Sequence, residues 1–130
     1  MKRVTGIGGI FFKSRDPKEL REWYRQHLGI DAGEYGATFQ WRDENDPEQI
    51  GQTVWSTFPQ DTKYFDPSTA PFMINYRVDD LNGLVAALRD EGVTVDKVES
   101  HEYGSFAWIS DPEGNRIELW EPAADQKGGD

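Results

Sequence analysis

The sequence contains no cysteine and only two histidines among its 130 residues. A chain without cysteine cannot form a disulfide, bind zinc through thiolates or use a thiol nucleophile. No stretch approaches the ~18 consecutive apolar residues of a membrane-spanning helix, and the N-terminal segment lacks the apolar core of a signal peptide. We therefore expect a soluble, cytoplasmic protein with no membrane partner.

Positive charge is also scarce. Lysine and arginine total 14 against 24 aspartates and glutamates, which gives a net charge of −10 at pH 7. Nucleic acid backbones are bound chiefly through cationic side chains, so this balance excludes nucleic acid as a partner. The 36% of hydrophobic residues and five tryptophans are nevertheless enough for a packed core. The length predicts a single domain over residues 1–130, because domains usually have ~100–200 residues.

The first half of the chain predicts a strand, a helix and a hairpin. Residues 4–12 form a short apolar run that is typical of a strand. Asp16 can cap a helix that ends at Gly29, because apolar residues recur between them at helical spacing. The segments 38–41 and 53–55 predict the two strands of the hairpin.

The second half repeats this order. Residues 72–78 predict a strand, Asp80 can cap a helix that ends at Gly92, and residues 93–95 are expected to begin another strand. Short motifs recur at nearly constant spacing: Glu34–Gly36 returns as Glu102–Gly104, Asp46–Glu48 as Asp111–Glu113, Trp41 as Trp108 and Trp55 as Trp120. Such a repeat predicts two modules.

Each module is expected to read strand–helix–strand–strand–strand. The first module spans about residues 4–60 and the second about residues 70–122, and residues 123–130 are expected to form a frayed tail.

The segment Asp111–Pro122 carries the most specific motif, with Asp-Pro at its start, Gly-Asn in its middle and Glu118-Leu119 near its end. This motif resembles the closing strand of the vicinal oxygen chelate superfamily, the group of glyoxalase I, bleomycin-resistance proteins and extradiol dioxygenases. The resemblance implies an α+β fold in which two tandem βαβββ modules form a cupped mixed sheet with helices on its outer face.

Catalytic members of this superfamily hold a divalent metal through the first and last strands of each module. The resemblance places these positions at Gly9, Thr53, Met73 and Glu118. Glycine offers no ligand atom, the methionine thioether is a poor ligand for a hard cation, and one carboxylate does not hold a metal tightly. We therefore predict no metal and no cofactor.

Glu118 is the candidate catalytic residue. Strand alternation places it on one face with Trp120, and the resemblance implies that this face lines the cup. Desolvation among tryptophans would raise the pKa of its carboxyl, which suits a general base. Alternatively, Glu118 is a structural carboxylate that binds a neighbour such as Asn75 or Arg116. The expected ligand-binding residues of the cup are Phe11, Trp41, Thr53, Trp55, Met73, Asn75, Trp108 and Trp120.

Two residues outside this set carry imidazole rings. His27 falls on the buried apolar stripe near the end of the first helix, where a structural or capping role is expected. His101 precedes a turn and is expected to be a surface residue. The alternative is that it acts as an acid or base at the mouth of the pocket.

The favoured interpretation is a homodimeric glyoxalase/bleomycin-resistance-like protein that encloses a small apolar, aromatic or cationic organic molecule without a metal. One alternative is a glyoxalase-type lyase, isomerase or dioxygenase that uses Glu118 as a base or weak metal ligand. The other is an interaction module whose tryptophans fill a closed core, and a spacious cavity would count against it.

Overall fold

The computed structural model describes residues 3–123, which form seven strands and two helices. The expected frayed tail therefore lies, apart from residue 123, outside the described residues. In chain order the elements are β1 (Val4–Ser14), α1 (Pro17–Leu28), β2 (Ala37–Arg42), β3 (Ile50–Pro59), β4 (Phe72–Val78), α2 (Leu81–Asp90), β5 (Lys97–His101), β6 (Gly104–Ser110) and β7 (Arg116–Pro122).

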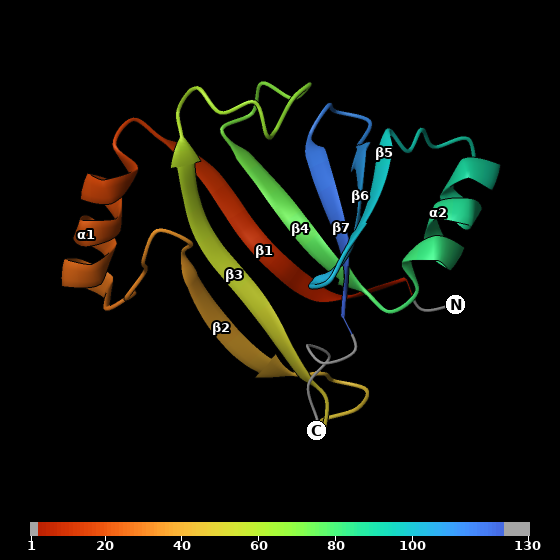
Figure 1. The fold of residues 1–130 in the computed structure, drawn as a ribbon, viewed down its shortest axis with the longest axis horizontal. Helices are drawn as coiled ribbons and strands as arrows, with labels where there is room; N and C mark the ends of the chain where they lie inside the picture. The colour runs from red at the N-terminus through yellow and green to blue at the C-terminus, as the bar shows by residue number, and fades with distance from the viewer. Residues whose placement is uncertain (1–2, 124–130) are drawn as a thin grey trace.

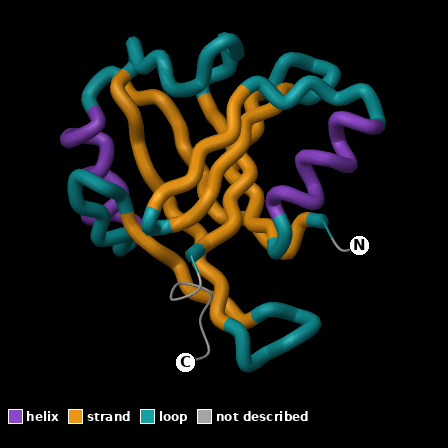
Figure 2. Tube along the Cα trace, turned by 45° about the vertical axis from the view of Figure 1, so that its right-hand side comes forward, coloured by secondary structure: helices purple, strands orange, loops and turns teal. Residues whose placement is uncertain are grey.

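All seven strands form one mixed sheet in the order β2-β3-β1-β4-β7-β6-β5. The two halves meet at the antiparallel pair β1 and β4, while β3 and β7 each run parallel to the first strand of their own half. The sheet curves, with α1 and α2 outside it at opposite ends (Figures 1 and 2). The predicted α+β class, with a cupped mixed sheet and outer helices, is confirmed.

Both helices begin where the sequence predicted, and α1 also ends at Gly29 as predicted, whereas α2 ends at Asp90 with Glu91 as its C-cap, just before the predicted Gly92. The Asp16 carboxylate accepts the Glu19 N–H at 3.1 Å, and the Asp80 carboxylate accepts the Gly83 N–H at 3.0 Å, so each aspartate caps its helix. Gly29 ends α1 with a φ of 71°, a left-handed conformation that glycine adopts without strain. Neither described helix is long and apolar enough to cross a membrane.

Two strand predictions are wrong. The first half has only two strands after its helix, because four residues (30–33) separate Gly29 from the Glu34–Gly36 turn, whereas nine residues (93–101) precede the equivalent turn. The missing strand is reduced to a single bridge between Gly33 and Gly36. In the second half β5 begins at Lys97 rather than at residues 93–95, since Val95 instead packs into the core beneath α2.

The two helices pack unequally. Leu81, Leu84 and Val85 of α2 are buried against β6 and β7. No residue of α1 is buried, although Tyr24 packs against β1 and β3. The expected burial of His27 is therefore wrong, because its ring lies exposed beside that of Trp23, 4.8 Å away.

A second apolar cluster occupies the face of the sheet opposite the helices. Phe11, Met73 and Trp108 contribute to it from the sheet, and Phe65 contributes from the linker between the halves. Phe65 and Met73 are completely buried. The linker therefore fills part of the cup, and only the remainder is open to a ligand.

Candidate functional site

Glu118 lies on the cupped face of β7. Its neighbour Leu119 points into the core beneath α2, so alternation directs the Glu118 side chain to the other side of the sheet. The parallel pairing of β4 with β7 places Asn75 directly beside Glu118, and the antiparallel pairing of β6 with β7 places Trp108 on its other side. Of the two neighbours expected for the carboxylate, Asn75 bonds to it, whereas Arg116 pairs with Asp96. Met73, the expected ligand position of β4, lies two residues before Asn75.

Three donors surround the Glu118 carboxylate, which is only 2% exposed. The Asn75 Nδ2 donates to Oε1 at 2.5 Å, and the Trp108 Nε1 donates to Oε2 at 3.0 Å. The Tyr64 hydroxyl, from the linker, donates to the same Oε2. We call these four residues the Glu118 cluster. A buried carboxylate with this many donors is fully engaged by hydrogen bonds rather than left unsatisfied.

The environment shifts both titratable groups of the cluster. Burial raises the pKa of Glu118, and this effect outweighs the three hydrogen bonds that stabilise its charged form. Burial, and then the negative charge of Glu118, raise the pKa of the Tyr64 hydroxyl far above its usual range. Tyr64 is therefore a neutral hydrogen-bond donor, and Glu118 is the group in the cluster that accepts a proton most readily.

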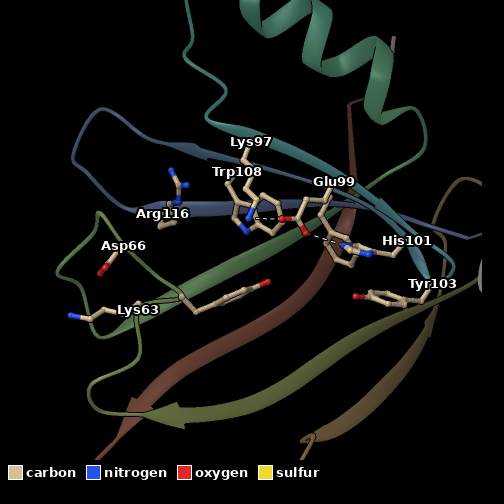
Figure 3. A pocket seen from close by; sticks show the side chains of 10 residues that line it. Lys63, Asp66, Lys97, Glu99, His101, Tyr103, Trp108 and Arg116 are labelled. Atoms are coloured by element: carbon tan, nitrogen blue, oxygen red, sulfur yellow. Dashed lines mark hydrogen bonds and ion pairs between the residues drawn. The ribbon is translucent and has the colours of Figure 1, made fainter.

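An open pocket of about 440 Å³ lies against the outer side of Tyr64 and Trp108. This volume falls within the ~300–1,000 Å³ that is usual for small-molecule sites. We call it the Tyr64 pocket, and it is lined by Lys63, Tyr64, Asp66, Lys97, Glu99, His101, Tyr103, Phe106, Trp108 and Arg116. Lys63 and Asp66 lie at one end and His101 and Tyr103 at the other (Figure 3). The existence of an open pocket counts against a closed core.

The rim of the pocket carries charges of both signs. Glu99 accepts hydrogen bonds from Lys97 and from His101, the latter at 2.9 Å, and these bonds lower the pKa of Glu99. The His101 ring stacks on the Tyr103 ring, with centroids 5.0 Å apart and planes inclined by 3°. His101 is exposed, as expected, and also lines the pocket, while a role for it as an acid or base stays a prediction.

Three of the predicted ligand-binding residues gather around Glu118. Asn75 and Trp108 bond to it, and the Trp120 ring lies parallel to the Phe106 ring of the pocket, with centroids 6.3 Å apart. Phe11 and Met73 belong instead to the closed cluster around Phe65 and do not line the pocket.

The remaining predicted residues lie elsewhere. Trp41 and Thr53 are hydrogen-bonded to each other at 2.8 Å and line a different hollow, which shares no residue with the Tyr64 pocket. The expected position of Trp55 on the cupped face is wrong. Its ring packs against Tyr24 of α1, 4.8 Å away, on the helix side of the sheet, because Trp55 pairs with the outward-facing Ile10.

Sequence reasoning missed Tyr64, which covers the carboxylate. Tyr64 belongs to the linker and has no counterpart in the repeat, so the comparison of the two halves could not find it. The available signal was an aromatic pair, Tyr64-Phe65, within an otherwise polar segment. Such a pair indicates that a linker packs onto the domain.

The residues present do not fit a catalytic metal centre. Within residues 3–123, no three His, Cys, Asp or Glu side chains lie close enough together to hold a metal ion. The oxygens of Glu118 already accept bonds from its three donors. At Gly9, the other central position, a Cβ would lie 2.6 Å from the Phe11 ring, so the space above that glycine is filled by an apolar side chain.

Known proteins resemble the chain at the level of family and fold. A family model described as a glyoxalase-like domain matches residues 9–120. Methylmalonyl-CoA epimerase from Mycobacterium tuberculosis is 22% identical, with a TM-score of 0.62 over 96% of this chain and 93% of that one. No curated protein sequence matches the chain.

Two further solved structures share the fold. A variant of the Streptomyces coelicolor methylmalonyl-CoA epimerase, in complex with 2-nitronate-propionyl-CoA, is 22% identical with a TM-score of 0.66 over 93% of this chain and 99% of that one. A catechol 2,3-dioxygenase is 19% identical with a TM-score of 0.56 over 99% of this chain and 45% of that one. The chain belongs to the glyoxalase-like domain family of the vicinal oxygen chelate superfamily.

Proposed function

We propose that this protein binds a small organic molecule in the Tyr64 pocket, without a metal, and that Glu118 anchors the ligand. The observation that carries the proposal is the position of a buried, hydrogen-bonded carboxylate directly behind the wall of an open pocket of about 440 Å³. Buried carboxylates are costly to the fold, and they occur preferentially at functional sites.

The lining supports an aromatic, apolar or cationic ligand. Phe106 and Trp108 offer nearly parallel ring faces, with centroids 6.1 Å apart. The Glu118 carboxylate behind Trp108 favours positive charge, while Lys63, Lys97 and Arg116 in the lining leave room for a ligand that also carries an acceptor. This is the mode of binding expected of a bleomycin-resistance-like protein. The Lys97 ammonium already lies 5.5 Å from the centroid of the Trp108 ring, which is the same kind of contact that a ligand cation would make.

The alternative is an enzyme of the glyoxalase-type lyase, isomerase or dioxygenase class in which Glu118 is the base. The raised pKa of Glu118 favours this alternative, because a carboxylate with a raised pKa removes a proton more readily near neutral pH. The similar structures include an epimerase in complex with a CoA ester analogue. Glu118 could take a proton from a substrate only after the Tyr64 hydroxyl has left Oε2.

A ligand screen that follows tryptophan fluorescence tests the proposal. Ligands with a donor group should bind Glu118→Gln about tenfold to a hundredfold more weakly, since a hydrogen bond to a charged group contributes roughly 1.5–3 kcal/mol. Trp120→Ala should weaken all ligands through lost contact area, once circular dichroism has shown that the variant is folded. The exposed Glu34 provides a matched control, Glu34→Gln, which should change nothing. The proposal would be refuted if the ligands found bound Glu118→Gln and Trp120→Ala with the same affinity as the wild type.

The homodimer and the cytoplasmic location stay predictions.

A further inference from the structure

Tyr64 occupies the place that a ligand of Glu118 would take. Its ring stacks on Phe58, with centroids 5.5 Å apart and planes inclined by 9°, and meets the edge of Trp108 at 6.4 Å. Its hydroxyl reaches the Glu118 carboxylate, and the residue is 43% exposed. Glu118 itself does not line the pocket. Tyr64 therefore stands between the open pocket and the carboxylate.

The donors around Glu118 differ in how firmly they are held. Asn75 and Trp108 lie on β4 and β6, the strands that pair with β7 on its two sides, and are 2% and 7% exposed. Tyr64 lies on the linker, and its neighbour Phe65 is completely buried and anchors that linker to the cup. The Tyr64 side chain can therefore rotate into the pocket while the backbone of the linker stays in place.

We propose that Tyr64 is an internal placeholder and that the ligand class is a phenol, a flat ring that carries a hydroxyl group and displaces the Tyr64 side chain from Glu118. The proposal rests on the proposed function, since it assumes that the Tyr64 pocket binds a small molecule. It also specifies the ligand, because the vacated space has the shape and the polarity of a phenol.

Each part of a phenol has a partner in the vacated space. The ring would stack on Phe58 and meet the edge of Trp108, as the Tyr64 ring does. The hydroxyl would donate to Oε2 of Glu118 and so restore the third hydrogen bond of the buried carboxylate. A ring without a donor would leave that oxygen one bond short, which makes Glu118 the group that discriminates between the two kinds of ring.

Binding of p-cresol and toluene to the full chain tests the proposal, because these probes differ only in the hydroxyl group. Affinities are measured by tryptophan fluorescence for the wild type, Tyr64→Phe and Glu118→Gln. Tyr35→Phe, at an 89% exposed tyrosine of the first half, is the matched control. Thermal melts establish that each variant is folded.

We expect p-cresol to bind the wild type at least tenfold more tightly than toluene. Tyr64→Phe should bind p-cresol about tenfold more tightly than the wild type, because the competing hydroxyl is lost while Glu118 remains. Glu118→Gln should lose most of the preference for p-cresol over toluene, and Tyr35→Phe should behave as the wild type.

The sign of the Tyr64→Phe effect decides between displacement and direct contact. If Tyr64 instead held the ligand, Tyr64→Phe would weaken p-cresol or leave it unchanged, and the placeholder proposal would be overturned while the pocket stood. If neither probe bound the wild type or Tyr64→Phe, and the wider screen also found no ligand dependent on Glu118, both this inference and the proposed function would fall. Equal affinities for p-cresol and toluene in all variants would overturn the ligand class alone.

Discussion

The parallel strand pairs of the two halves carry different residues. In the second half, Asn75 of β4 pairs with Glu118 of β7. In the first half, Gly9 of β1 pairs with Val54 of β3, and Gly9 also faces Asn75 across the junction of the halves. The same backbone arrangement thus holds an amide and a carboxylate in one half, and a glycine and a valine in the other. The repeat supplies the fold, whereas only its second copy supplies a polar site.

The helices show a second difference between the halves. Leu84 of α2 is 3% exposed within the core, whereas Leu28 of α1 is 60% exposed. The second half, which carries the site, therefore has the better-packed helix. A firmly packed helix and strand layer keeps Asn75, Trp108 and Glu118 in fixed positions, which is what a preorganised binding site requires.

The largest expected effect is on the free energy of unfolding, and it tests whether the two helices pack unequally. Leu84→Ala should lower the free energy of unfolding by about 2–5 kcal/mol, since it removes a buried side chain, while Leu28→Ala should change it by less than about 0.5 kcal/mol. Urea unfolding of the two variants measures both values. Equal losses at the two positions would contradict the unequal packing.

The metal content of the protein tests whether the Glu118 cluster holds a metal ion without help from the first half. The donor set around Glu118 contains an amide, an indole and a phenol, and Gly9 has no side chain. Elemental analysis of untagged protein after dialysis should therefore find well below one equivalent of transition metal per chain. One tightly held equivalent of zinc, nickel or iron would contradict the assignment.

A smaller effect concerns pH. Because burial raises the pKa of Glu118, the folded state binds more protons than the unfolded state between the unfolded pKa and the folded pKa. The contribution of Glu118 to stability is therefore present below this window and is lost as the pH rises through it. The free energy of unfolding of the wild type relative to Glu118→Gln should fall as the pH rises above the ordinary pKa of a glutamate. A difference that rises with pH would contradict the raised pKa.

The fold could be predicted because its signals are local or repeated. The caps at Asp16 and Asp80, the strand over residues 72–78 and the recurring turns each follow from a few neighbouring residues. The first half lacks its third strand because the segment of residues 30–33 is too short to form one. The recurring motifs carry no information about the length of that segment.

The candidate site could be predicted only in part. Alternation along β7 placed Glu118 and Trp120 on one face, and register then brought Asn75 and Trp108 to the carboxylate. The repeat of Trp55 as Trp120 predicted the same face for both, but Trp55 pairs with Ile10 and lies on the helix side of the sheet. Side chains alternate between faces along a strand, so an error of one residue in the alignment of the halves moves a side chain to the other face. Tyr64 could not be placed because it belongs to a linker. The path of a linker depends on tertiary packing, and no periodic pattern in the sequence reports it.

The five tryptophans allow a direct test of the claim that only the second half binds a ligand. Trp108 and Trp120 lie in or beside the Glu118 cluster, whereas Trp23, Trp41 and Trp55 lie in the first half. Heteronuclear NMR during titration with a ligand from the screen follows all five indole N–H signals, assigned with single Trp→Phe variants. The account predicts that the signals of Trp108 and Trp120 shift most and saturate together. Larger shifts at Trp41 or Trp55 would contradict it.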